Sequence, residues 1–143
     1  MGILSISIIF VLFATSAFSY SVGNRTDNAT FSNVEEVTTF HFHLTLSLDF
    51  NSQVANGSNL LSMISLIDNL STVILDVRAL DIEKVTDGEE NELVWNILDL
   101  NPNIGEALSI SLKSPKKKND NFSIQVFYRT TSEGLSLNWL EPS

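Results

Sequence analysis

The sequence predicts an all-β domain of about seven or eight strands. The stretch at residues 40–50 alternates apolar and polar side chains without interruption. A period of two is typical of a strand, because successive side chains point to opposite faces. Later segments repeat the alternation at short intervals between turn-forming residues, and no segment has the apolar spacing of an amphipathic helix. This pattern favours a mostly antiparallel sandwich or a curved antiparallel sheet.

Length and composition restrict the possible functions. A chain of 143 residues is expected to form one domain. It has no cysteine, which excludes a disulfide framework, thiol catalysis and cysteine-ligated metals. Its net charge of −9 disfavours nucleic acid as a partner, because phosphate binding requires clustered Lys and Arg.

Residues 1–19 are predicted to be a secretory signal peptide. They carry no charged side chain, an apolar run at residues 3–13 and small residues at Ala17 and Ser19 that suit cleavage. The alternative is an uncleaved signal anchor, but the run is shorter than the roughly 20 residues that cross a bilayer. We therefore expect a secreted protein with no membrane association after cleavage.

Five Asn-x-Ser/Thr sequons accompany this leader and predict a glycoprotein. They lie at Asn24, Asn28, Asn56, Asn69 and Asn121. Residues 20–36 hold the first two sequons, are rich in Asn, Thr and Ser, and lack apolar periodicity. We interpret them as a flexible, glycosylated arm before a β-domain at residues 37–143.

The first predicted strand covers residues 38–50. Its even positions are expected to face the core and its odd positions to face solvent. The apolar even positions are Phe40, Phe42, Leu44, Leu46, Leu48 and Phe50. Turns are expected at residues 51–52 and again at Asn56–Gly57.

Four further strands are predicted in the middle of the chain. They cover residues 60–67, 73–77, 80–85 and 92–98. The first of these is apolar on both faces and is expected to be covered on both sides. Asp87–Gly88 predicts a hairpin between the last two, because Gly tolerates the positive φ of tight hairpin turns. In the returning strand, Leu93, Trp95 and Ile97 share one face.

The end of the chain predicts strands at residues 108–112, 122–128 and 135–140. Pro115 is expected to end the first of these. The apolar positions of the second alternate with polar ones, except at Phe127. A lysine-rich loop separates the two.

Several groups of side chains could carry chemistry. His41 and His43 lie on one strand face and could contribute two zinc ligands, although a site needs a third ligand and supporting hydrogen bonds. We favour a solvated or partner-facing surface for them, and predict no metal site. No Ser lies in a G-x-S-x-G turn, and Trp95 and Trp139 are interpreted as core or interface residues.

Two charged clusters have similar alternatives. Acid–base chemistry or calcium binding could use the acidic residues around the predicted hairpin, but a solvated hairpin tip is favoured. These residues are Asp81, Glu83, Asp87, Glu89, Glu90 and Glu92. The lysines could attract an anionic membrane or a glycosaminoglycan, but a solubilising turn is favoured. These are Lys113, Lys116, Lys117 and Lys118.

Colinear segments across residues 38–142 resemble the aminopeptidase-N-like zinc metallopeptidases, and within them the branch of leukotriene hydrolase and aminopeptidase B. The matching segments are H-F-H-L-T-L-S-L-D-F at 41–50, Gly57 with the run to Leu66, D-N-L-S-T-V-I-L-D-V-R-A-L-D-I-E-K-V at 68–85, I-S-L at 110–112, the Lys118–Asn119 turn and L-N-W-L at 137–140. The resemblance implies a saddle-shaped N-terminal β-domain that packs against a catalytic domain, here incomplete at its C-terminal side.

The residues that perform catalysis in that family have no counterpart in this sequence. Neither the G-x-M-E-N exopeptidase motif nor the H-E-x-x-H zinc motif occurs, and the two histidines have no Glu in the required relation. We therefore predict no catalytic, cofactor-binding or metal-binding residue on this chain, although the resembled enzymes use zinc.

Three hypotheses follow. The first is a secreted, non-catalytic β-domain that contacts a protein or peptide through the face that meets the catalytic domain in the family. The second is an N-terminal fragment of a longer secreted zinc aminopeptidase. The third, an enzyme in its own right, requires residues that the sequence lacks.

Overall fold

The computed structural model describes residues 29–101, 105–131 and 139, and these residues form seven strands and no helix. The strands are β1 (Val37–Asp49), β2 (Val54–Ser65), β3 (Leu70–Val77), β4 (Leu80–Asp87), β5 (Val94–Asn101), β6 (Gly105–Lys116) and β7 (Asn121–Thr130). The prediction of an all-β domain is confirmed. The structure describes no helix that is long and apolar enough to span a bilayer.

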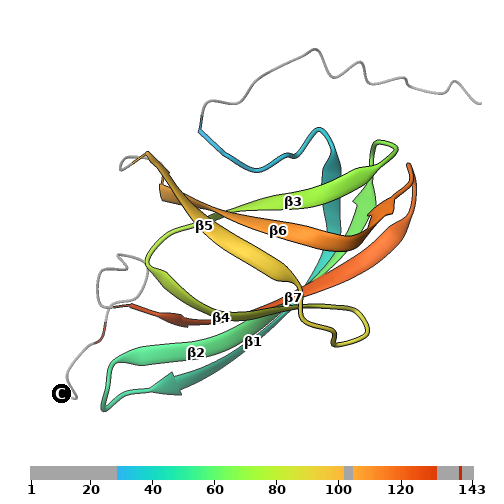
Figure 1. Cartoon of the computed structure of the whole chain (residues 1–143). Helices are drawn as coiled ribbons and strands as arrows, with labels where there is room; N and C mark the ends of the chain where they lie inside the picture. The colour runs from blue at the N-terminus through green and yellow to red at the C-terminus, as the bar shows by residue number, and fades with distance from the viewer. Residues whose placement is uncertain (1–28, 102–104, 132–138, 140–143) are drawn as a thin grey trace, which may run out of the picture.

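The strands form two antiparallel sheets (Figure 1). The four-stranded sheet has the order β1-β2-β7-β4, and the three-stranded sheet has the order β3-β6-β5. The chain passes from one sheet to the other after β2, β3, β4 and β6, so neighbours in sequence often lie in different sheets. In Figure 1 the three-stranded sheet lies over one part of the other sheet, and the β1–β2 hairpin extends beyond it.

The core lies between the two sheets. Its apolar residues come from every strand except β5, with Leu93 just before it, and all are at most 9% exposed. They are Val37, Met63, Leu70, Val73, Val77, Val85, Leu93, Leu108, Ile110, Ile124 and Val126. Trp95 and Ile97 of β5 pack against this core as predicted, whereas Val94 is exposed.

A β-bulge at Phe40 changes which positions of β1 face inward. Before it, Val37 is opposite Ser65 and Thr39 is opposite Met63; after it, Phe42 is opposite Leu61. An extra residue in one strand shifts the alternation by one position. Odd positions of β1 therefore face inward before the bulge, and even positions face inward after it. This is why Val37, at an odd position, reaches the core.

The turn predicted at Asn56–Gly57 is wrong. β2 begins at Val54, and Asn56 and Gly57 pair with Ser47 and Leu46 of β1 within a continuous hairpin. The reversal occurs at residues 50–53, where the turn predicted at residues 51–52 is confirmed. There the Asp49 carboxylate accepts hydrogen bonds from the backbone N–H groups of Asn51, at 2.9 Å, and Ser52, at 3.3 Å.

The hairpin predicted at Asp87–Gly88 forms only in part. Thr86 and Glu92 make an isolated antiparallel bridge, and the Leu93 N–H donates to the Val85 carbonyl oxygen at 2.9 Å. Beyond this turn the two strands separate, because β4 pairs with β7 and β5 pairs with β6. Pro115 also does not end its strand, since β6 continues to Lys116.

Part of the predicted flexible arm is fixed to β3. The Asp76 carboxylate accepts hydrogen bonds from the Thr30 hydroxyl, from the Phe31 N–H at 2.7 Å and from the Ser32 hydroxyl at 2.8 Å. The Asn33 side chain accepts from the Ile74 N–H at 2.8 Å and donates to the Thr72 carbonyl at 3.0 Å. Asn33 thus bonds the edge of β3 as a neighbouring strand would.

Three predictions lie outside the described residues: the signal peptide at 1–19, the beginning of the arm at 20–28, and, apart from Trp139, the last strand at 135–140. The two sequons Asn24 and Asn28 fall there as well.

Candidate functional site

The feature that most suggests function is the inner face of β1 beyond its bulge. Four apolar side chains lie there in one row, and their exposed fractions range from 45% for Leu44 to 61% for Phe42. They are Phe42, Leu44, Leu46 and Leu48, called here the β1 apolar row. The prediction that these side chains are buried is wrong: over β1 only Val37 is buried, at 5% exposed.

The register shows that the β1 apolar row belongs to the core face of the sheet. Phe42 is opposite Leu61 of β2, which in turn is opposite Ile124 of β7, a fully buried core residue. Cross-strand partners in register share a face. The core surface therefore continues outward onto β1 after the three-stranded sheet ends, and no described residue buries the row there.

Gly57 lets the row pack closely against the sheet beneath it. A Cβ at this position would lie 2.6 Å from the Leu46 Cδ2 and 2.8 Å from the Thr45 carbonyl oxygen. It would also lie 3.5 Å from the Tyr128 ring, on the other side. The missing side chain allows Leu46 to lie over the glycine. Tyr128, on the other side of Gly57, is partly buried, and this burial raises the pKa of its phenol above the ordinary 10.0.

One polar side chain lies within this apolar surface. Asn59 is opposite Leu44 on β1 and Val126 on β7. Its Oδ1 is buried and accepts no hydrogen bond from the residues that the structure describes. A buried acceptor without a donor costs on the order of 1–3 kcal/mol, so Asn59 places a destabilising group directly beside the β1 apolar row.

The far end of β1 meets the C-terminal part of the chain. The ring of Trp139 contacts the ring of Phe50 edge to face, with 5.4 Å between the centroids. The interpretation of Trp139 as a packing residue agrees with this contact. Phe50 itself remains 72% exposed.

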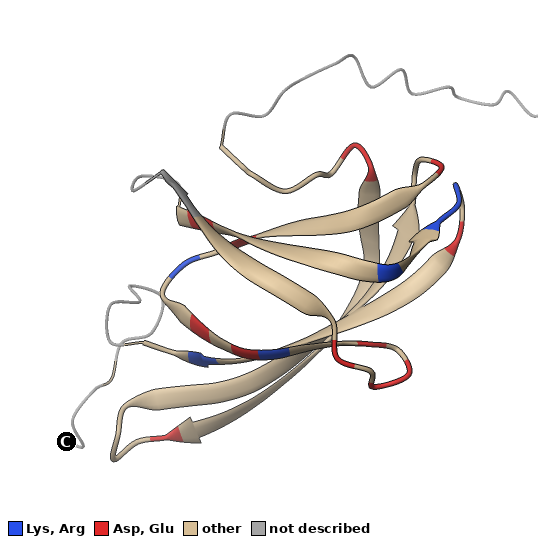
Figure 2. Ribbon diagram, in the orientation of Figure 1, with Lys and Arg blue, Asp and Glu red and all other residues tan. Residues whose placement is uncertain are grey.

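Charge is absent from the β1 apolar row. Figure 2 shows β1 and β2 uncharged along nearly their whole length, with acidic colour at the end of β1, where Asp49 is the last residue. His41 and His43 project from the opposite, outer face and are exposed. In the part of the chain that the structure describes, no three His, Asp or Glu side chains gather to hold a metal ion.

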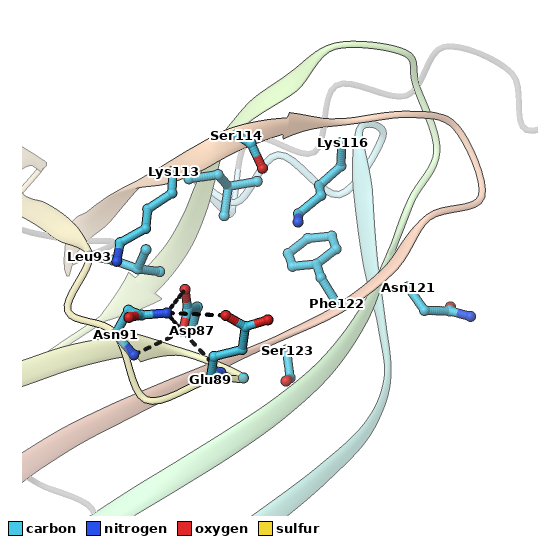
Figure 3. A pocket seen from close by; sticks show the side chains of 12 residues that line it. Asp87, Glu89, Asn91, Leu93, Lys113, Ser114, Lys116, Asn121, Phe122 and Ser123 are labelled. Atoms are coloured by element: carbon cyan, nitrogen blue, oxygen red, sulfur yellow. Dashed lines mark hydrogen bonds between the residues drawn. The ribbon is translucent and has the colours of Figure 1, made fainter.

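A second feature is a hollow of about 390 Å³ at the other end of the molecule, between the Asp87 turn and the β6–β7 loop (Figure 3). Lys113, Lys116, Glu89 and the ring of Phe122 face into it, and Lys116 Nζ lies 5.9 Å from the ring centroid. Two of the lysines predicted to form a solubilising turn therefore line a hollow. Lys117 and Lys118 instead shape the loop through their backbone N–H groups. The Lys117 N–H donates to the Asp120 carboxylate at 2.8 Å, and the Lys118 N–H donates to the Asp68 carboxylate at 3.1 Å.

Asp87 organises its own turn. Desolvation alone would raise the pKa of this carboxyl group, but several hydrogen bonds and the nearby Lys113 outweigh it and hold the pKa below 3.8. The donors are the Asn91 N–H at 2.9 Å, the Glu89 N–H at 3.0 Å and the Asn91 amide. Glu89, Glu90 and Glu92 are exposed, as expected for a solvated tip, and Asp81 makes one 4.0 Å contact to Arg129.

Three of the five sequons lie in described residues, and all three Asn side chains are exposed. Asn56 and Asn121 share the outer face with Ser47 and Ile64, their partners in register. Asn69 occupies the turn between β2 and β3 with a φ of 63°. None of these three lies in the β1 apolar row.

Both the fold and the sequence of this chain resemble the N-terminal region of one class of proteins. The related proteins and structural neighbours are leukotriene A4 hydrolases and M1 aminopeptidases, and the chain matches their N-terminal region over about 80% of its own length. No protein-family model matches the sequence.

Individual relatives make the likeness specific. Leucine aminopeptidase 2 of Phaeosphaeria nodorum is 30% identical over 118 residues, which are 82% of this chain and 19% of the relative. The native leukotriene A4 hydrolase of Saccharomyces cerevisiae superimposes with a TM-score of 0.72 at 27% identity, over 82% of this chain and 19% of that one. An M1 zinc metallopeptidase of Deinococcus radiodurans shares the fold, with a TM-score of 0.54 at 14% identity over 67% of this chain and 21% of its own.

This chain spans 17% to 19% of the length of the curated relatives it matches. The resemblance predicted from the sequence is confirmed, and the relatives named here include enzymes that bind zinc.

Proposed function

We propose that this chain is a secreted, non-catalytic β-domain that binds a protein partner through the β1 apolar row. The observation that carries the proposal is the row itself: four large apolar side chains on the core face of a sheet, each about half exposed. Contiguous exposed apolar surface on a soluble protein marks an interaction site.

Two features support a protein as the occupant. The row carries no charge, and interface cores are depleted of charged residues. The described sequons avoid it, so glycans would leave the face free.

The proposed partner is the remaining part of an M1-type zinc aminopeptidase. The supporting observation is that the chain corresponds to less than a fifth of the relatives that it resembles. That part would supply the zinc and the activated water that remove N-terminal amino acids, and this domain would supply a packing surface. The partner is a separate polypeptide in our first hypothesis.

The same observation supports a second hypothesis, in which this chain is the N-terminal part of a longer secreted aminopeptidase and the contact is made within one polypeptide. A transcript that continues beyond residue 143 into an H-E-x-x-H segment would establish the second hypothesis. Secretion of a product of this size, ending at Ser143, would establish the first.

Docking can be tested with the aminopeptidase of Phaeosphaeria nodorum after removal of the N-terminal region that this chain matches. The secreted chain is co-expressed with this truncated enzyme, and co-purification and restored aminopeptidase activity are measured. We expect the double variant Leu44→Ser/Leu48→Ser to weaken the complex at least about tenfold, because each of the two substitutions removes an apolar side chain that the partner would bury. Ser47→Ala on the outer face is the matched control, and an unchanged complex with the double variant would contradict the proposal.

The other parts of the proposal have direct readouts. Mass spectrometry of the secreted product should find an N-terminus at Phe18 or Tyr20, and endoglycosidase should increase its electrophoretic mobility. The purified chain alone, with added zinc, should release no amino acid from an aminoacyl p-nitroanilide. Turnover by this chain without a partner would refute its non-catalytic role.

A further inference from the structure

β1 is an edge strand of the four-stranded sheet. It pairs with β2 along one side, and no described strand pairs with its other side. Beyond the bulge, its regular part covers residues 41–49, all of them exposed. A long edge presents unpaired N–H and C=O groups, which can pair with an added strand.

The sequence of this regular part is self-complementary about Thr45. Antiparallel partners must share a face, so an apolar residue should oppose an apolar one and a polar residue a polar one. When a second copy is laid antiparallel with Thr45 opposite Thr45, every pair meets this condition. The pairs are His41 with Asp49, Phe42 with Leu48, His43 with Ser47 and Leu44 with Leu46.

The central register also provides a polar contact at each end. The His41 imidazole of one copy would be opposite the Asp49 carboxylate of the other, twice in a symmetric pair. Asp49 is exposed, and hydrogen bonds from the Ser52 hydroxyl and the Ser52 and Asn51 N–H groups lower its pKa below 3.8. The carboxylate is therefore ionised at neutral pH and is fixed at the end of the strand, where it can accept a hydrogen bond.

Neighbouring registers lose these contacts. With Leu44 at the centre, Asp49 is opposite Thr39, beyond the bulge. With Leu46 at the centre, His41 is opposite Asn51, which lies outside the strand. Only the Thr45-centred register pairs all nine residues of the regular segment.

We propose that two copies of this chain associate through their β1 edges, antiparallel and centred on Thr45. The association joins the two four-stranded sheets into one and uses the edge of β1 rather than its inner face. It is therefore independent of the docking function proposed above, and the β1 apolar rows of both copies remain on the same continuous face.

The register can be measured directly because the chain has no cysteine of its own. In the proposed dimer two Thr45 side chains are directly opposite, within the range of cross-strand Cβ pairs of about 4.5–5.5 Å. Purified Thr45→Cys should therefore form a disulfide-linked dimer under mild oxidation. Ser47→Cys is the control, because the two Ser47 residues would lie four positions apart. Equal or faster cross-linking of Ser47→Cys, or none of Thr45→Cys, would overturn the proposal.

The strength of association is tested by sedimentation of the unmodified chain from micromolar to millimolar concentration, with far-UV circular dichroism as a check of folding. We expect a concentration-dependent dimer. His41→Asp places two carboxylates opposite each other and should weaken dimerisation about tenfold. The double variant His41→Asp/Asp49→Asn should restore it, since the amide oxygen introduced by the second change can still accept the N–H bonds of the turn.

His43→Asp is the matched charge control and should leave the dimer intact, because its predicted neighbour is Ser47. Greater weakening by His43→Asp than by His41→Asp would refute the register. A chain that stays monomeric at every concentration would refute the dimer itself.

Discussion

The rings of Phe50 and Trp139 meet edge to face with their centroids 5.4 Å apart, although 89 positions separate them in the sequence. This geometry is favoured for aromatic pairs and contributes about 0.5–1.5 kcal/mol beyond the area that is buried. It connects the β1–β2 turn with the last residue that the structure describes. Trp139 is therefore held beside the end of β1, next to the β1 apolar row.

Phe50→Ala and Trp139→Ala should each lower the free energy of unfolding, and the double variant should lower it by less than the sum. The expected difference is about 1 kcal/mol, because either substitution alone already removes the ring contact. Urea unfolding of the four proteins measures it. Phe40→Ala, an exposed aromatic of the same strand, is the control and should be additive with Trp139→Ala. Additivity for Phe50 as well would contradict the contact.

Gly57→Ala should destabilise the domain by about 1–3 kcal/mol, because the added Cβ would be 2.8 Å from a backbone oxygen that cannot move away. Leu46→Ala should rescue only part of this loss, since it removes the nearby Cδ2 but not the Thr45 carbonyl. Gly88→Ala is the matched control. Its only contact under 3 Å is with the Ser123 hydroxyl, which can rotate. Thermal unfolding that ranks Gly88→Ala as the more damaging change would refute this explanation.

Asn59→Leu should stabilise the isolated domain by about 1 kcal/mol. The substitution removes a buried acceptor without a partner and replaces it with an apolar group of similar size. Asn96→Leu, at an exposed position of β5, serves as the control and should give no such gain. If chemical unfolding instead shows a loss for Asn59→Leu, then Asn59 makes a stabilising bond in the folded domain.

Asp76 should make the stability of the domain depend on pH, because its stabilising hydrogen bonds are lost when the carboxylate is protonated in acid. Desolvation acts to raise the pKa of this carboxyl group, but hydrogen bonds from Thr30, Phe31 and Ser32 outweigh it and lower the pKa below its ordinary 3.8. A lowered pKa in the folded state contributes stability that is present above the ordinary pKa and is lost as pH falls through the folded one. The bonds are worth about 1 kcal/mol after allowance for solvent exposure.

Asp76→Asn should therefore be less stable than the natural chain at neutral pH, and the difference should shrink as pH falls below 3.8. Denaturant unfolding across this range measures the difference, with Asp81→Asn as a matched loss of one charge. A difference for Asp76→Asn that stays constant to the lowest pH would rule out the carboxylate as its cause.

The sequence predicted the strands well because alternation is a local property. The apolar positions of β7, Ile124 and Val126, are buried as their pattern indicates, and Trp95 and Ile97 pack on the core. Burial of the β1 apolar row was predicted wrongly because it depends on how far the other sheet extends. The pattern of Phe42 and Leu44 alone does not contain that information.

Other features required the three-dimensional arrangement. The partners of Asp76 lie about 45 positions earlier in the chain, in a segment whose composition indicates flexibility. The bulge at Phe40 coincides with a break in the alternation, because two polar residues, Thr38 and Thr39, separate the apolar Val37 and Phe40. The prediction began the strand at residue 38 and so missed this break. Gly57 was interpreted as a turn residue because glycine is common in turns, whereas here it makes room for Leu46.

The strand order has a consequence for synthesis of the protein. β7 is the sixth strand to follow β1, yet it lies between β2 and β4 and supplies the hydrogen-bonding partner of each. Until residues 121–130 have left the ribosome, β4 has no place in its sheet and β2 has only β1 beside it. Pairing between distant segments is slow to form. The nascent domain must therefore acquire its native structure late, almost as a single event, with the open edges of β2 and β4 in need of protection from premature aggregation until then.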